Sequence, residues 1–164
     1  MDWLTGINSR LSRWAMYLAV AALLGIVALV DFGVVKRYVY NDAQPYVEQV
    51  ALMLVIVVAM FGASAGVRDE GHIGMESLVG LLPEKFQFWI GVTVGLLTIS
   101  FGALLFGGCL MMADSVMHNT IPTLGVSEAL RYVPPIVAGI LIILFSIEHL
   151  IAMFRKSDVV KSWH

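Results

Sequence analysis

The sequence predicts an all-α integral membrane protein with four transmembrane helices and a short amphipathic helix at the membrane surface. Two observations support this fold class. Of the 164 residues, 59% are hydrophobic and 13% are charged, whereas a soluble domain has about 25% charged residues. The apolar residues also form four long runs, and a helix of about 20 apolar residues spans a bilayer core. We therefore expect a single membrane domain over residues 1–164.

The first apolar run predicts a transmembrane helix over about residues 14–35. It is too long for the apolar core of a cleaved signal peptide, and no small-x-small cleavage site follows it. The segment before it, residues 1–13, is polar. Because Leu4, Ile7 and Leu11 have helical spacing, we expect this segment to form a short surface helix that leads into the membrane.

The second span is expected over about residues 47–67 and is followed by a charged segment, residues 68–72. Beyond it, residues 72–83 combine apolar and polar positions at helical spacing. This segment is too short and too polar to cross a bilayer, so we expect a helix that lies flat at the interface. Its predicted apolar face consists of Met75, Leu78, Val79 and Leu82.

The third and fourth spans are expected over about residues 86–113 and 132–154. At 1.5 Å per residue the third would be ~42 Å long, so it must tilt or project beyond the hydrocarbon. Basic residues are more frequent in the segments on the side of the termini than in the two other loops. The positive-inside rule therefore favours both termini in the cytoplasm.

Polar groups near the membrane have more than one interpretation. Glu48 lies in the first turn of the second helix, where the helix dipole favours an anion. Glu148 and His149 lie near the predicted inner end of the fourth span, where snorkelling or pairing with a basic neighbour is the simpler interpretation and a proton relay the alternative. Small residues at 62–66 suit packing within this chain or docking onto another membrane subunit.

The composition excludes several functions. The net charge of −2 provides no basic stripe for a nucleic acid. The single cysteine, Cys109, cannot form an internal disulfide. His and acidic residues do not recur at metal-ligand spacing, and His149 is the one histidine inside an apolar run. We expect neither a cofactor nor an enzymatic activity.

The order of motifs resembles the small membrane subunit, of DctQ type, of tripartite ATP-independent periplasmic (TRAP) transporters. The shared pattern is an acid at the start of the second helix, a Gly-Ala patch near its end, an arginine, a Gly-His-Ile elbow, an acid and a closing proline. The chain departs from this pattern at Gln49, where the family usually has a second acid. The matching residues are Glu48, Gly62, Ala63, Arg68, Gly71, His72, Ile73, Glu76 and Pro83.

The resemblance implies a location in the bacterial inner membrane and three partners: a large membrane subunit, a periplasmic substrate-binding protein and membrane lipids. The large subunit would move as an elevator and carry the sodium and substrate sites, with a carboxylate as substrate. Sialic acid is favoured, with C4-dicarboxylates next. The small subunit would brace the stationary scaffold.

The outer loops suggest a docking surface for the binding protein, because they carry few charges and each could therefore matter. The alternative to the whole interpretation is a self-sufficient four-helix channel or membrane enzyme. The candidate docking residues are Lys36, Arg37, Asp42, Asp114, Glu128 and Arg131.

Overall fold

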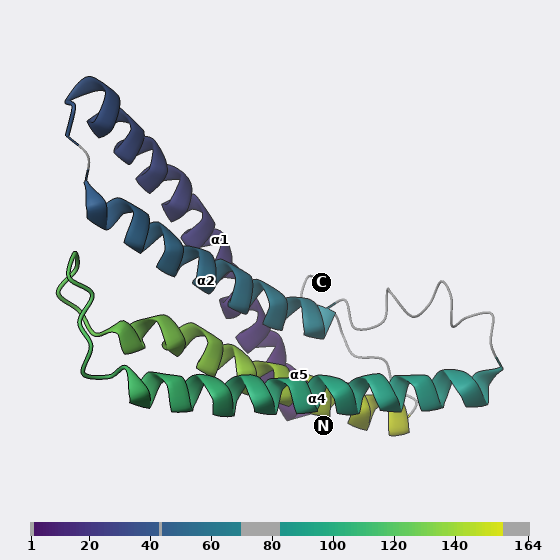
Figure 1. Ribbon diagram of the computed structural model, residues 1–164. Coiled ribbons are helices and arrows are strands. Elements are labelled where there is room, and N and C mark those ends of the chain that lie inside the picture. The colour runs from purple at the N-terminus through teal and green to yellow at the C-terminus, as the bar shows by residue number, and fades with distance from the viewer. Residues whose placement is uncertain (1, 43, 70–82, 156–164) are drawn as a thin grey trace.

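The computed structural model describes residues 2–42, 44–69 and 83–155, which form an all-helical chain (Figure 1). Four of the helices are long and apolar enough to cross a membrane, so the predicted fold class is confirmed. The interfacial helix expected over residues 72–83 falls almost entirely outside the described residues. The helices are α1 (Asp2–Val39), α2 (Pro45–Asp69), α4 (Glu84–Ser115), the 3-10 helix η1 (Glu128–Tyr132) and α5 (Val133–Arg155).

The long helices form two antiparallel hairpins that meet through α2 and α5. The most extensive contacts are those within the α4–α5 hairpin and within the α1–α2 hairpin, followed by those between α2 and α5. The helices therefore follow one another in the spatial order α1, α2, α5, α4. In Figure 1 the hairpins are close together near the C-terminal end of α2 and diverge toward their loops.

Helix α1 extends well beyond the predicted first span. Its 38 residues correspond to ~57 Å of helix. The expected helix that leads into the membrane is present, because residues 2–13 are helical and continue into the span without a break. The reason for this continuity is a buried face of small side chains that continues through both segments, formed by Asn8, Ser12, Ala15, Ala19 and Ala22. That residues 2–13 lie at the membrane surface stays a prediction.

Helices α4 and α5 approach each other closely at a pair of glycines. A Cβ atom built on Gly139 would lie 3.0 Å from the carbonyl oxygen of Gly102, and one built on Gly102 would lie 3.1 Å from that of Gly139. Because the obstructing atoms belong to the backbone, neither helix can move aside locally. Small residues therefore set the distance between these two helices.

The best-buried segment of the chain is α5. In its most apolar stretch 44% of the residues are buried, compared with 6% in that of α4. Phe145 is fully buried, and its cluster joins α5 to Ala15 of α1 and to Phe61 and Val67 of α2. The other helices expose broad apolar surfaces, as expected for helices that contact lipid or another membrane subunit.

Candidate functional site

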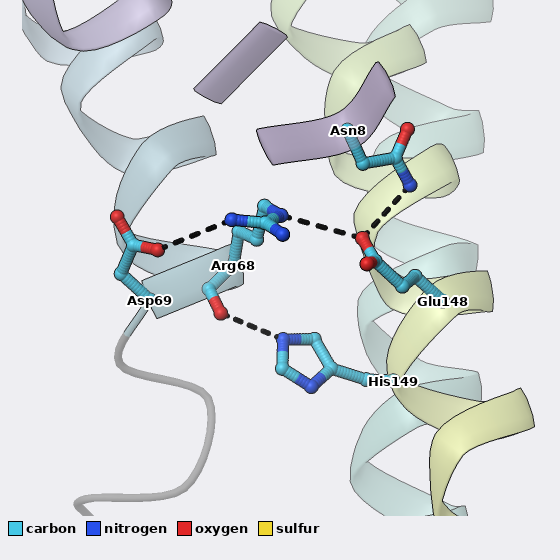
Figure 2. A network of polar contacts seen from close by, with 5 residues as sticks. All are labelled: Asn8, Arg68, Asp69, Glu148 and His149. Atoms are coloured by element: carbon cyan, nitrogen blue, oxygen red, sulfur yellow. Dashed lines mark hydrogen bonds and ion pairs between the residues drawn. The ribbon is translucent and has the colours of Figure 1, made fainter. Parts of the chain in front are cut away.

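A buried polar network joins three helices near the C-terminal end of α2 (Figure 2). Arg68, in the last turn of α2, donates from Nε to Oε2 of Glu148 on α5 at 3.3 Å. The same carboxylate oxygen accepts a hydrogen bond of 2.8 Å from Nδ2 of Asn8 on α1. One carboxylate on α5 therefore holds a side chain from each helix of the other hairpin.

Both charges of this ion pair are removed from solvent. The side chain of Arg68 is 0% exposed and that of Glu148 is 4% exposed. A charge buried to this degree is tolerated when it is paired and hydrogen-bonded, and loss of one partner leaves the other uncompensated. The network therefore joins the two hairpins near the C-terminal end of α2.

Two further contacts surround Arg68. Its Nη1 lies 3.6 Å from Oδ1 of Asp69. Its carbonyl oxygen, at the end of α2, lies 2.8 Å from Nε2 of His149. Because a carbonyl only accepts, Nε2 must carry the hydrogen and donate. His149 thus satisfies one of the carbonyls that every helix leaves without an intrahelical partner in its last turn.

The network also contains unused hydrogen-bonding capacity. Within the described ranges, Oε1 of Glu148 and the hydroxyl oxygens of Ser12 and Ser146 are buried and have no hydrogen-bond partner. Ser12 lies one helical turn beyond Asn8 and so on the same face of α1, whereas Ser146 lies two residues before Glu148 and so on a different face of α5. The buried polar groups on the Asn8 face of α1 therefore extend beyond the residues drawn in Figure 2.

A second polar contact joins the hairpins at the opposite end. Arg131, in η1, donates from Nη2 to Oε1 of Gln49 on α2. Its Nη1 lies 3.4 Å from Oε1 of Glu128, one turn earlier in η1. Gln49, the residue at which the sequence departs from the family pattern, is thus an acceptor for the arginine of the other hairpin.

The family-motif residues do not gather into one site. Glu48 is exposed near the start of α2, whereas Arg68 is buried in its last turn. Gly62 and Ala63 lie between them, and a Cβ atom on Gly62 would meet nothing within 4 Å. Pro83 precedes α4 as its N-cap. The motif residues Gly71, His72, Ile73 and Glu76, and the predicted apolar face Met75, Leu78, Val79 and Leu82, lie outside the described residues.

The six candidate docking residues all lie in or beside the two loops at the diverging end. Nζ of Lys36 lies 6.0 Å from the ring centroid of Phe32 and 5.4 Å from that of Tyr40. Arg37 lines a cavity of about 510 Å³ between α1 and α2, together with Glu48. Asp42 accepts a hydrogen bond from Gln44, and Asp114 is exposed. Glu128 and Arg131 form the ion pair described above.

Comparison with known proteins decides the family. Residues 26–156 match the family described as the DctQ component of tripartite ATP-independent periplasmic transporters. The chain belongs to this family. It is thereby a small permease subunit of a TRAP transporter and a multi-pass membrane protein, and the resemblance seen in the sequence is confirmed.

Two relatives of this DctQ chain come from Haemophilus influenzae. One, from strain Rd, is provisionally named a TRAP transporter small permease protein; it is 27% identical over 135 residues, which cover 82% of this chain and 83% of the relative. The other, from strain 86-028NP, is the sialic acid TRAP transporter permease protein SiaT. It is 28% identical over 89 residues, 54% of this chain and only 14% of the relative, whose own chain is therefore much longer.

Proposed function

We propose that this DctQ chain is a stationary scaffold in a sodium-coupled TRAP transporter of the bacterial inner membrane. A large membrane subunit carries the sodium and substrate sites and moves as an elevator, and a periplasmic binding protein delivers the substrate. Both termini face the cytoplasm. The substrate is a carboxylate, with sialic acid favoured and C4-dicarboxylates next. No cofactor is expected in this chain.

The distribution of buried charge is the observation that carries this proposal. Among the described residues, the buried charged side chains are Arg68 and Glu148, and they neutralise each other at one end of α2. A chain that conducted a carboxylate would need polar partners along the depth of the membrane. Its buried charges would then extend toward the middle of the spans, whereas here they form a closed pair.

The arrangement of the hairpins fits a load-bearing role. Polar contacts join them at both ends, Arg68 with Glu148 at one and Arg131 with Gln49 at the other. One turn from Glu148, Phe145 packs against both helices of the α1–α2 hairpin. A unit held at both ends resists sliding of one hairpin along the other, which a support beside a moving subunit requires.

The partial relative supports association with a larger membrane protein. SiaT contains a segment similar to this chain within a much longer permease polypeptide. Two segments of one polypeptide are held at high local concentration, so such a segment is expected to pack against the rest of its chain. We infer that this chain makes the equivalent contact with a separate large subunit, and that its exposed helix faces supply the surface.

Co-purification tests the proposal. The affinity-tagged chain is expressed with a large TRAP membrane subunit from the same organism, and membranes are extracted in mild detergent. We expect the two proteins to elute together at a fixed ratio. In the control, an unrelated tagged four-helix membrane protein should not retain the large subunit. Elution of this chain alone, with the large subunit present and folded in the same membranes, would contradict the proposed role.

A further inference from the structure

An apolar groove lies where the two hairpins diverge. It has a volume of about 340 Å³ and lies between α2 and the start of α5. We call it the α2–η1 groove. One wall follows α2 from Val50 to Val57, eight residues or ~10 Å of helix. The other wall includes Leu130, Arg131 and Pro134.

Opposite charges lie together at one side of this groove. Arg131 lines it and lies 3.4 Å from Glu128, and the two side chains are 28% and 37% exposed. An ion pair this accessible is weak, because water competes for both groups. Nη2 of the guanidinium also donates to Gln49, and the surface that both side chains of the pair keep toward solvent can still meet a new partner: an anion on the guanidinium and a cation on the carboxylate.

The depth of the groove matches a lipid. Arg131 and Glu128 lie in η1, at the very start of the fourth apolar span, Glu128–Phe154. The end of a span is where lipid headgroups are expected. The apolar wall continues from there along α2, into the hydrocarbon. A bilayer lipid has the same order of parts: charged groups outside and an acyl chain inside.

We propose that the α2–η1 groove binds one zwitterionic aminophospholipid of the phosphatidylethanolamine type. One acyl chain lies against Met53, Leu54 and Val57, the phosphate contacts Arg131, and the ammonium contacts Glu128. An anionic lipid such as phosphatidylglycerol matches the site less well, because its headgroup has no cation for Glu128. The bound lipid fills the space between the diverging hairpins and so fixes their separation. It also withdraws Glu128 and Arg131 from the docking surface predicted for the binding protein.

Photo-cross-linking identifies the occupant. Benzoylphenylalanine is placed at Met53 in the full chain, co-expressed with its large subunit, and the membranes are irradiated. We expect mass spectrometry to find a peptide that carries the added mass of a phosphatidylethanolamine. A cross-link to the large subunit at this position would overturn the proposal. The same label at an exposed α4 position is the positive control, and an unmodified Met53 peptide beside a modified control peptide would also overturn it.

Lipid retention tests the headgroup contacts. The purified complex is exchanged into detergent with equal amounts of phosphatidylethanolamine and phosphatidylglycerol, and bound lipid is measured by native mass spectrometry. Arg131→Gln is expected to lower phosphatidylethanolamine retention at least fivefold, with the exposed control Arg10→Gln unchanged. Leu130→Trp keeps Arg131 but fills the exposed side of the α2–η1 groove, so it should also lower phosphatidylethanolamine retention. This variant provides the test if Arg131→Gln misfolds. Equal retention of both lipids, or unchanged retention in Leu130→Trp, would overturn the proposal.

Discussion

Arg68, in the last turn of α2, donates a hydrogen bond of 3.3 Å to Glu148, which lies 80 residues later on α5. Both side chains are buried, so the contact is a closed connection between hairpins that are far apart in sequence. Asn8 of α1 binds the same carboxylate oxygen. Three of the four spanning helices are thus joined through one buried acid.

Loss of the buried arginine should destabilise the protein strongly. Arg68→Ala leaves Glu148 buried with one partner fewer, and removal of one member of a buried ion pair costs about 3–5 kcal/mol. Thermal unfolding of the purified complex, followed by circular dichroism, measures the effect. The exposed control Arg37→Ala should change stability by less than about 0.5 kcal/mol.

Simultaneous replacement of both charges should restore much of that loss. Arg68→Met with Glu148→Met removes both charges and fills similar volume, and such exchanges are often neutral or stabilising. If the double variant is as unstable as Arg68→Ala, the shape of the packing rather than the charge pair holds the hairpins together at this end.

A charge at position 49 should strengthen the opposite contact. Gln49→Glu converts a neutral acceptor for Arg131 into a charged one, and the pair is partly exposed, so we expect roughly 0.5–1 kcal/mol of added stability. The gain should shrink at high salt because exposed charges are screened. A gain that persists unchanged in 1 M salt, or a loss of stability, would contradict the observed geometry.

Two glycines of the α4–α5 hairpin should respond in opposite directions to the same substitution. Gly139→Ala forces a Cβ atom against the backbone of α4 and should cost about 1–3 kcal/mol. Gly107→Ala meets nothing within 4 Å and should gain up to about 1 kcal/mol through helix propensity. Unfolding of the full chain in detergent compares them. Equal effects would rule out the close helix crossing.

Charge reversal at the first outer loop should slow substrate delivery. Lys36→Glu with Arg37→Glu should lower uptake about tenfold at low ionic strength, since long-range charge attraction raises association rates. The defect should diminish as salt is added. The matched control is Arg10→Glu with Arg13→Glu, two exposed basic residues near the other end of α1. If uptake is indifferent to the reversal at residues 36 and 37, the large subunit carries the docking surface.

The membrane class and the four spans could be predicted because length, apolarity and charge are local properties of the sequence. The helix arrangement could not, since it depends on which small faces meet. That Gly102 of α4 meets Gly139 of α5 is a tertiary relation, which spacing along the chain does not show. The N-terminal segment was expected, from Leu4, Ile7 and Leu11, to form a surface helix that leads into the span, but that spacing does not reveal the burial of Asn8 and Ser12, which is a tertiary property.

The polar network could be predicted only in part. Pairing of Glu148 with a basic residue was one of the expected interpretations and is confirmed, but a neighbour on its own helix was as plausible as Arg68 on α2. A signal was available in Asn8 and Ser12, polar residues one turn apart in a helix that otherwise buries alanines. Gln49 was identified as a departure from the family pattern, yet its partner Arg131 lies 82 residues away.

Transport by reconstituted proteoliposomes tests the central claim most directly. This chain is reconstituted alone, or with the large subunit and the binding protein, and uptake of labelled sialic acid and of a C4-dicarboxylate is followed under a sodium gradient. The scaffold account predicts uptake of a carboxylate by the full assembly and none by the isolated chain. Sodium-driven uptake by the isolated chain would contradict it.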